Sequence, residues 1–210
     1  MVNKARVHAW MSPLDGTEVA TVPITGPSDV PGVVARARQA FPSWSSTTLE
    51  SRGRIIRRAA HILESRSEEL AHIVRRETGK PHGAALGEVS AAVEMGYLVA
   101  SHGRHESGQL LPSAVPGRQV RVQRMPRGVA ALIVTYNAPL PNFAWKVFPA
   151  VMAGNTAILK PSPANPQSAE TFLAILREAG VPDDVLQVVH GEGDTAAALI
   201  DSGVELVSFT

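Results

Sequence analysis

The sequence predicts an α/β fold in which a parallel sheet follows a mostly helical amino-terminal segment with a small β element. Up to about residue 110, apolar residues recur mainly at the three-to-four-residue spacing of helices. After residue 128, short apolar segments alternate with helix-like segments of roughly 10 to 13 residues. This alternation is typical of βαβ units, whose strands are parallel because each crossover helix returns the chain to the same end of the sheet.

The amino-terminal segment begins with a predicted hairpin and a first helix. A Pro/Asp/Gly turn precedes a β-branched run within residues 12–22, which is the pattern of two paired strands. Ser28 or Asp29 can then cap a helix whose apolar face runs from Val30 to Phe41. Pro42 is expected to end this helix, because proline has no backbone N–H to donate within a helix.

Residues 49–77 and 83–101 carry the remaining helical pattern of this segment. The first range predicts two helices or one bent helix, and its arginines at 52, 54, 57 and 58 are expected to form a solvated face. Thr78-Gly79-Lys80-Pro81 separates the two ranges, since glycine near a helix end and a following proline stop a helix.

A change of architecture is predicted after residue 108. Residues 108–117 are rich in Gly, Pro and Ser and are expected to form a linker. Val120 and Val122 then alternate with polar residues, as in an edge strand. We therefore divide the chain into a helical amino-terminal part that packs on the next domain (1–117), an edge-strand connector (118–127) and the first half of a Rossmann-like nucleotide-binding domain (128–210).

The Rossmann-like sheet is predicted to begin with the apolar run Val129–Val134. A continuously apolar strand is expected where both faces of a sheet are covered. Gly154 and Gly180 end two of the helices that follow. The predicted elements are, in order, strand 129–134, helix 140–152, strand 156–159, helix 167–179, strand 185–189, helix 195–202 and strand 206–209.

The composition narrows the class of protein. It is 44% hydrophobic and 19% charged with a net charge of +1, as in an ordinary globular protein. Because acidic and basic residues are interspersed, a small-molecule partner is favoured over nucleic acid or a membrane surface. No membrane span or secretory signal is visible, so we expect a cytoplasmic protein. The cysteine count is zero, which excludes disulfides and a cysteine nucleophile within these residues.

Candidate ligand-binding residues follow the predicted parallel strands, because loop amides and helix amino termini converge there. Asn137 can donate its side-chain amide to a developing oxyanion, or simply cap the next helix. Lys160 can meet a cofactor ribose or phosphate, or be a solvated surface lysine. Residues 191–196 fit the phosphate-binding pattern G-x-G-x-x-A, which also marks plain tight turns.

No metal site is expected. His102, His105 and Glu106 have spacing that can ligate a metal, but they follow a polar helix end that we expect to face solvent.

Three segments resemble the aldehyde dehydrogenase superfamily in order and spacing. The family runs P-W-N-F-P, then W-K-x-x-P-A-L, then A-G-N-x-x-x-x-K-P-S/A-E. Two flanking segments are similar to the family's E-T-G-K-P helix break and its E-A-G-x-P, so the resemblance covers nearly the whole chain. In this sequence the three segments are Ile133–Leu140, Trp145–Ala150 and Ala153–Ser162, and the flanking ones are Glu77–Pro81 with Glu88 and Glu178–Pro182.

The resemblance implies NAD(P)-dependent oxidation of an aldehyde to a carboxylic acid. In the family a cysteine thiolate attacks the aldehyde, hydride passes to nicotinamide, and a glutamate activates the water that releases the acid. Asn137 matches the asparagine that stabilises the oxyanion and is the expected catalytic residue. Lys146 matches a lysine near the active site whose role stays open. The expected cofactor-binding residues are Val134, Thr135, Tyr136, Lys160, Ser162 and Gly193.

The sequence departs from the family beside the cofactor. Pro163 replaces the glutamate that grips the ribose, so a 2′-phosphate meets less repulsion and the expected cofactor is NAD or NADP. Tyr136 and Ala138 replace the usual Trp and Phe. The resemblance also implies that the turn at 191–196 is not the main phosphate cradle.

The resemblance further implies an amino-terminal fragment. Family members continue from S-F-T into G-S-x-x-x-G and supply the cysteine, the glutamate and most dimerising strands later, so we expect the 210 residues to be inactive alone and the full-length enzyme to be a homo-oligomer. The alternative is a non-catalytic short form that binds adenosine cofactors weakly or pairs with full-length subunits.

Overall fold

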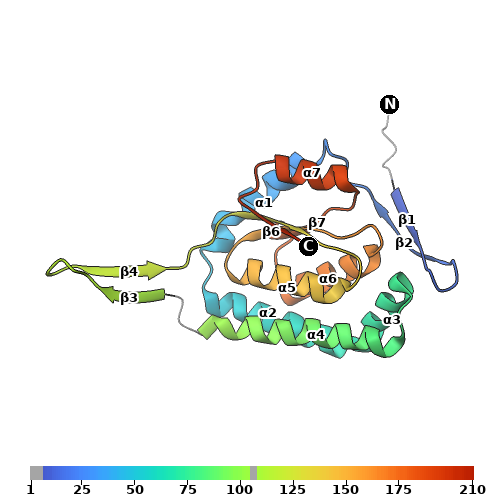
Figure 1. Ribbon diagram of the computed structural model, residues 1–210, viewed down its shortest axis with the longest axis horizontal. Helices are drawn as coiled ribbons and strands as arrows, with labels where there is room; N and C mark the ends of the chain where they lie inside the picture. Colours follow the sequence, from blue (N-terminus) through green and yellow to red (C-terminus); the bar gives the residue numbers. More distant parts are fainter. Residues whose placement is uncertain (1–6, 105–107) are drawn as a thin grey trace.

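The computed structural model describes residues 7–104 and 108–210 and confirms the α/β architecture. At its centre lies a four-stranded parallel sheet in the order β7-β6-β5-β8, with helices on both faces (Figure 1). The strands are β5 (Val129–Ile133), β6 (Thr156–Lys160), β7 (Leu186–Val188) and β8 (Leu206–Phe209). The connecting helices are α5 (Pro139–Met152), α6 (Pro166–Ala179) and α7 (Gly193–Asp201).

Alternate side chains of the central strands enter two separate cores. Val129 and Ala131 of β5 pack with α1 (Val30–Ser45) and with Leu199 of α7 on one face. Ala130 and Leu132 pack with α5 and α6 on the other. Every residue of β5 and β6 is buried, which explains their continuously apolar sequence.

The chain reverses its direction of winding between β5 and β8. From β5 the sheet grows outward through β6 and β7, whereas β8 returns to the opposite side of β5. In open parallel sheets, ligands bind beyond the carboxyl ends of strands at such a reversal. The loop that follows β5 therefore lies where a ligand is expected.

A layer of helices covers α5 and α6 on the side away from the sheet (Figure 1). The range 49–77 forms two helices, α2 (Leu49–Ser65) and α3 (Ser67–Thr78), and α4 (His82–Ser101) follows the break predicted at 78–81. Gly79 ends α3 with a φ of +75°, a left-handed conformation that glycine adopts without strain. The short 3-10 turn η1 (His102–Arg104) follows α4, and the predicted amino-terminal hairpin is β1 (Val7–Met11) with β2 (Glu18–Pro23).

The expectation that Pro42 ends the first helix is wrong, because α1 continues to Ser45. The side chain of Trp44 is buried, and its indole Nε1 donates a hydrogen bond to the carbonyl of Val151 at 3.1 Å. Tertiary packing of Trp44 thus holds one more helical turn despite the donor that proline lacks.

The predicted linker at 108–117 is also wrong in part. Its first residues form β3 (Gly108–Pro112), which pairs antiparallel with β4 (Gln119–Gln123). The pair is a separate hairpin that projects from the body of the molecule, and all ten strand residues are exposed (Figure 1). Val120 and Val122 therefore belong to an isolated two-stranded ladder and not to the edge of the main sheet.

The predicted solvated arginine face holds for Arg54, Arg57 and Arg58 but not for Arg52, which is only 5% exposed. Its guanidinium Nε donates to the carbonyl of Met152 at 2.8 Å, and Nη1 donates to the hydroxyl of Thr47 at 3.1 Å. Burial lowers the pKa of Arg52. The side chain ties the start of α2 to the end of α5.

Candidate functional site

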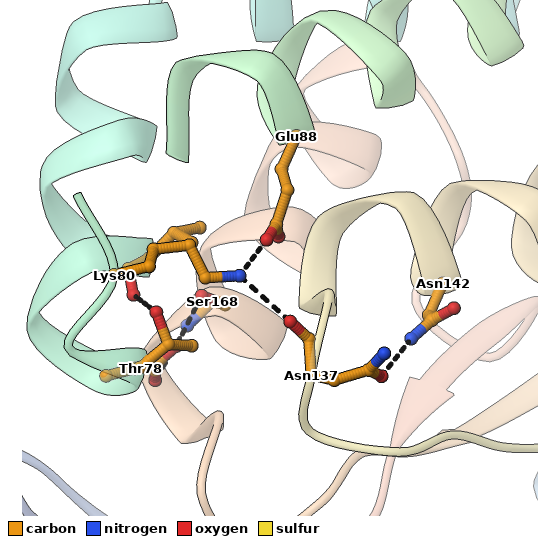
Figure 2. A network of polar contacts seen from close by, with 8 residues as sticks. Thr78, Lys80, Glu88, Asn137, Asn142 and Ser168 are labelled. Carbon is orange, nitrogen blue, oxygen red and sulfur yellow. Dashed lines mark hydrogen bonds and ion pairs between the residues drawn. The ribbon is translucent and has the colours of Figure 1, made fainter. Parts of the chain in front are cut away.

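Asn137 lies in the exposed loop between β5 and α5. Its backbone carbonyl accepts a hydrogen bond from Lys80 Nζ at 2.9 Å, and its side-chain Oδ1 accepts one from Asn142 Nδ2 at 3.4 Å (Figure 2). Because Oδ1 is engaged, the Nδ2 end of the amide is left to donate to a ligand. The alternative role as a helix cap is wrong, because α5 has Ala138 at its N-cap and no side-chain cap.

Lys80 and Glu88 reach this loop from the amino-terminal segment. Lys80 also forms an ion pair with Glu88, and the two expose only 17% and 14% of their side chains. Burial lowers the pKa of Lys80. Within the described residues, Oε2 of Glu88 is buried without a hydrogen-bond partner. The sequence predicts a helix break around Lys80, in the segment Glu77–Pro81. It gives no signal that Lys80 or Glu88 lies near Asn137.

Lys160 ends β6 and is only 5% exposed, so the surface-lysine alternative is wrong. Its Nζ donates to the carbonyl of Pro161 at 3.1 Å, the one hydrogen bond that the described residues give it. Burial lowers the pKa of Lys160, while the charges of Glu192 and Asp194 oppose that shift. An ammonium group has three protons to donate, so Lys160 retains donor capacity for a ligand.

The loops after β5 and β6 lie at the same edge of the sheet, because the two strands are parallel and Ile133 pairs with Lys160. Val134 is buried, and its backbone N–H donates to the carbonyl of Lys160 at 3.2 Å. Thr135 is half-buried and Tyr136 is 63% exposed. The structure thus places the predicted residues 134–137 and 160–162 at the same edge of the sheet, with direct contact between Val134 and Lys160.

A cavity of about 350 Å³ opens where β6 and β7 end. Gly193 is the first residue of α7 and has open space where a Cβ would stand. Gly191 is the constrained glycine of this turn, since a Cβ there would overlap the hydroxyl of Thr195. Ser162 is half-buried beside the cavity, and its Oγ accepts from the N–H of Ala164 at 3.2 Å. The cavity is lined by His8, Ile24, Pro163, His190, Gly191, Glu192 and Asp194.

Glu77 is a buried carboxyl group that sequence reasoning did not single out, and it is 1% exposed. It accepts hydrogen bonds from the backbone N–H groups of Gln167 at 2.6 Å and Ser168 at 3.2 Å, and from the Ser168 hydroxyl. These donors are the first amides of α6, so Glu77 caps that helix from another part of the chain. Burial raises the pKa of Glu77 to about 7 against these hydrogen bonds.

Two further polar side chains form hydrogen bonds that connect strands of the sheet to neighbouring segments. Asn155 of the A-G-N segment accepts from the backbone N–H groups of Arg127 at 2.6 Å and Gly128 at 3.1 Å, just before β5. Lys146 of α5 donates from Nζ to the hydroxyl of Ser208 on β8 at 2.8 Å, and burial lowers its pKa. Lys146 therefore spans the winding reversal between β5 and β8.

Among the metal candidates, His102 lies in η1, whereas His105 and Glu106 fall outside the described residues. In the part of the chain that the structure describes, no three side chains of His, Cys, Asp or Glu gather closely enough to hold a metal ion. No helix within the same residues is both long and apolar enough to cross a membrane.

The model of the aldehyde dehydrogenase family matches residues 2–210, nearly the whole chain. The chain belongs to this family. Its curated relatives include malonate-semialdehyde dehydrogenase 1 of Geobacillus thermodenitrificans, which is 35% identical over 98% of this chain and 43% of its own length. Vanillin dehydrogenase of Amycolatopsis is 35% identical over 96% of this chain and 42% of its own length. The chain thus spans less than half the length of the aldehyde dehydrogenases that it matches.

Solved structures agree with this assignment. An NADP-dependent enzyme of E. coli superposes with a TM-score of 0.93 at 29% identity, over 97% of this chain and 43% of that one. An NAD-dependent benzaldehyde dehydrogenase of Corynebacterium glutamicum gives a TM-score of 0.91 at 30% identity, over 99% of this chain and 46% of that one. The described fold is therefore that of the amino-terminal part of aldehyde dehydrogenases.

Proposed function

We propose that this chain supplies the oxyanion donor and the first half of the cofactor domain of an enzyme that oxidises an aldehyde to a carboxylic acid with NAD(P). The observation that carries the proposal is the pairing of two loops at one edge of the sheet. The amide of Asn137 follows β5 with its donor end available, and the buried ammonium of Lys160 ends the adjacent strand. We keep residues 1–117, 118–127 and 128–210 as the proposed division of the chain.

Asn137 is proposed as the residue that stabilises charge during the reaction. As a nucleophile attacks the aldehyde, its oxygen becomes negatively charged, and Nδ2 of Asn137 donates a hydrogen bond to it. One such donor contributes about 2.7 to 4 kcal/mol to transition-state stabilisation in other enzymes. Because the 210 residues contain no cysteine, a thiolate nucleophile has to come from outside them.

The residues at the edge of the sheet are proposed to bind an adenosine cofactor. The nicotinamide cofactor, when bound, accepts the hydride of the aldehyde. We propose that Lys160 and Ser162 donate to its adenosine ribose, that Val134, Thr135 and Tyr136 run alongside it, and that Gly193 lies near its adenine. The proposal is supported by the unused donors of Lys160 and by the cavity of about 350 Å³, whose lining includes the sequence neighbours of Ser162 and Gly193, namely Pro163, Glu192 and Asp194.

Either NAD or NADP is proposed as the cofactor. Pro163 lines the cavity and offers no carboxylate to bind both ribose hydroxyls or to repel a 2′-phosphate. The similar structures include one enzyme described as NADP-dependent and one described as NAD-dependent.

A homo-oligomer of the full-length enzyme is proposed from the projecting hairpin. Leu110 and Leu111 on β3 and Val120 and Val122 on β4 are between 42% and 64% exposed. Because an isolated two-stranded hairpin is only marginally stable in water, we infer that this one packs against another copy. We also propose a cytoplasmic location, which is compatible with a chain that contains no cysteine and therefore no disulfide.

Calorimetry on the 210-residue chain with NAD and with NADP tests the proposal. We expect weak binding of at least one cofactor, weakened about tenfold by Lys160→Met, which is a loss of about 1.4 kcal/mol. Asn137→Ala is the control and should leave this affinity unchanged. Absence of heat with both cofactors would contradict the cofactor assignment.

The isolated chain should form no NAD(P)H from aldehydes, and turnover that Asn137→Ala abolishes would contradict that expectation.

A second candidate, pairing with a full-length subunit without catalysis, is supported by β8. Within the described residues β8 pairs with β5 alone, and Phe209 on it is 75% exposed. A strand with a free edge can pair with another chain. Mixing the chain with a full-length homologue should give co-elution, and separate elution would remove this candidate.

A further inference from the structure

The end of α3 and the connection that leads to α4 contact the two segments that follow β5 and β6. Gly79 turns the chain sharply, and the side chains on either side of it reach in different directions. Glu77 accepts hydrogen bonds from the first amides of α6. Lys80 donates to the carbonyl of Asn137 before α5 (Figure 2). One four-residue segment thus holds the start of both helices that follow the ligand-binding strands.

Lys80 is the group of this segment that acts on Asn137. Its Nζ lies between Glu88 and the Asn137 carbonyl, so one ammonium holds two acceptors from different elements. On the far side of Asn137, Asn142 engages the side-chain Oδ1. The residue is therefore held through its carbonyl and its side-chain oxygen, which leaves Nδ2 as its available donor.

Stability of the fold alone does not explain the Lys80–Glu88 pair. Both side chains are mostly buried, and Oε2 of Glu88 has no partner within the described residues. Replacing a buried ion pair by uncharged groups of similar shape is often neutral or stabilising, because removing two charges from water is costly. Apolar groups of similar shape cannot reproduce the hydrogen bond from the ammonium to the Asn137 carbonyl.

We infer that Lys80, held in place by Glu88, is a positioning residue for Asn137, and that Glu77 in the same segment positions the loop that carries Lys160 and Ser162. The inference rests on the proposed function, since it concerns how the oxyanion donor and the cofactor residues are set relative to each other. The two loops follow different strands, and this segment connects them through side chains. Reacting groups must be held to within about half an ångström of their productive positions. One segment that contacts both loops fixes their relative position better than two independent loops would.

Hydrogen exchange and NMR on the 210-residue chain test Lys80. The variant Lys80→Met/Glu88→Gln removes both charges, whereas Glu88→Gln alone is the matched control that keeps the ammonium beside Asn137. In the double variant we expect the amide of Asn142, which donates to the carbonyl of Ala138 at 3.1 Å, to exchange about tenfold faster. The side-chain amide signals of Asn137 should move toward those of an asparagine whose Oδ1 accepts no hydrogen bond from Asn142. Glutamine keeps a side-chain oxygen that can accept from the Lys80 ammonium, so the control should change both readouts much less than the double variant does.

The Glu77 arm uses Glu77→Leu with Glu77→Gln as its control. The leucine variant should speed exchange of the Gln167 and Ser168 amides and leave Asn142 unchanged, while glutamine retains an acceptor for them. If leucine prevents folding, the glutamine variant must still protect both amides. Exchange at Gln167 and Ser168 that is the same with leucine as with glutamate would overturn the role of Glu77.

Three outcomes would overturn the role of Lys80. Asn137 signals and Asn142 exchange could stay as in the control, the double variant could fail to fold, or its changes could spread evenly over the sheet. The last two would make the pair a stabilising element of the fold and not a positioning one.

In a longer active enzyme that carries these residues, the double variant should lower kcat, and adding it to Asn137→Ala should lower kcat no further. The proposed function fails on a different readout, the absence of cofactor binding, so the two can be rejected separately.

Discussion

Replacing Glu77 by glutamine should remove a pH dependence from the stability of the protein. Burial raises the pKa of this carboxyl group from its ordinary value of 4.5 to about 7, and hydrogen bonds from Ser168 and Gln167 only partly oppose the shift. The folded protein therefore binds this proton more tightly than the unfolded chain does. The resulting stabilisation is complete below about pH 4.5 and is lost as the pH rises through about 7.

The size of the effect follows from the two pKa values. The interval from 4.5 to about 7 corresponds to about 3 kcal/mol, at about 1.4 kcal/mol per pKa unit. Between about pH 5.5 and about pH 8 the linkage relation gives a loss of about 2 kcal/mol. With a urea dependence of about 2 kcal/mol per molar, the unfolding midpoint falls by about 1 M. Glutamine keeps an acceptor for the first amides of α6 but does not titrate.

Urea unfolding of both proteins, followed by circular dichroism at the two pH values and one ionic strength, measures this effect. Other titrating groups act equally on both proteins, so the difference between them isolates Glu77. Parallel pH dependences would refute the reasoning. A wild-type protein that gains stability over the variant as the pH rises would show that the donors of α6 outweigh burial and that the pKa is lowered instead.

Three further changes test the packing and the cavity. Asn155→Ala leaves two backbone amides before β5 without their acceptor and should lower the free energy of unfolding by about 2 kcal/mol; Asn155→Asp should restore only part of it, because it keeps the acceptor but loses the donor to the carbonyl of Ala150. Gly96→Ala should cost about 1 to 3 kcal/mol, because the new Cβ would lie 2.8 Å from a side chain of α2, whereas Gly87→Ala in the same helix faces open space and should not destabilise. Glu192→Gln with Asp194→Asn should raise the affinity for NADP relative to NAD about tenfold by removing carboxylates from the cavity; an unchanged ratio in calorimetry would exclude them from contact with the 2′-phosphate.

Local patterns were sufficient to predict most of the fold. The buried run at β5 and the alternation that follows it specified a parallel sheet, and the structure confirms each strand and helix of residues 129–209 to within two or three residues. Such patterns report burial and helix geometry, which depend on neighbours in the sequence. The wrong predictions concern residues whose structure depends on distant parts of the chain. Pro42 and Arg52 were assigned from their own chemistry. The burial of Trp44 keeps Pro42 inside a helix, and a backbone carbonyl of α5 binds the buried Arg52.

The candidate site divides in the same way. Asn137 and Lys160 were predictable as candidate residues because they follow apolar strands and match family motifs. Lys80 and Glu77 were not predictable as neighbours of the site, since they contact it across 57 and 90 residues of sequence. Pairing of charged side chains over such distances leaves no local pattern.

The amino-acid sequence by itself determined the α/β class, the order of the elements and the family, because periodicity and motif spacing are local properties of the chain. Only the tertiary structure decided that Arg52 is buried, that β3 and β4 form a projecting hairpin, and that Glu77 at the end of α3 and Lys80 just after it contact the starts of α6 and α5. Those outcomes depend on which distant groups are brought within hydrogen-bonding reach, and this is settled when the sheet and its helices pack together.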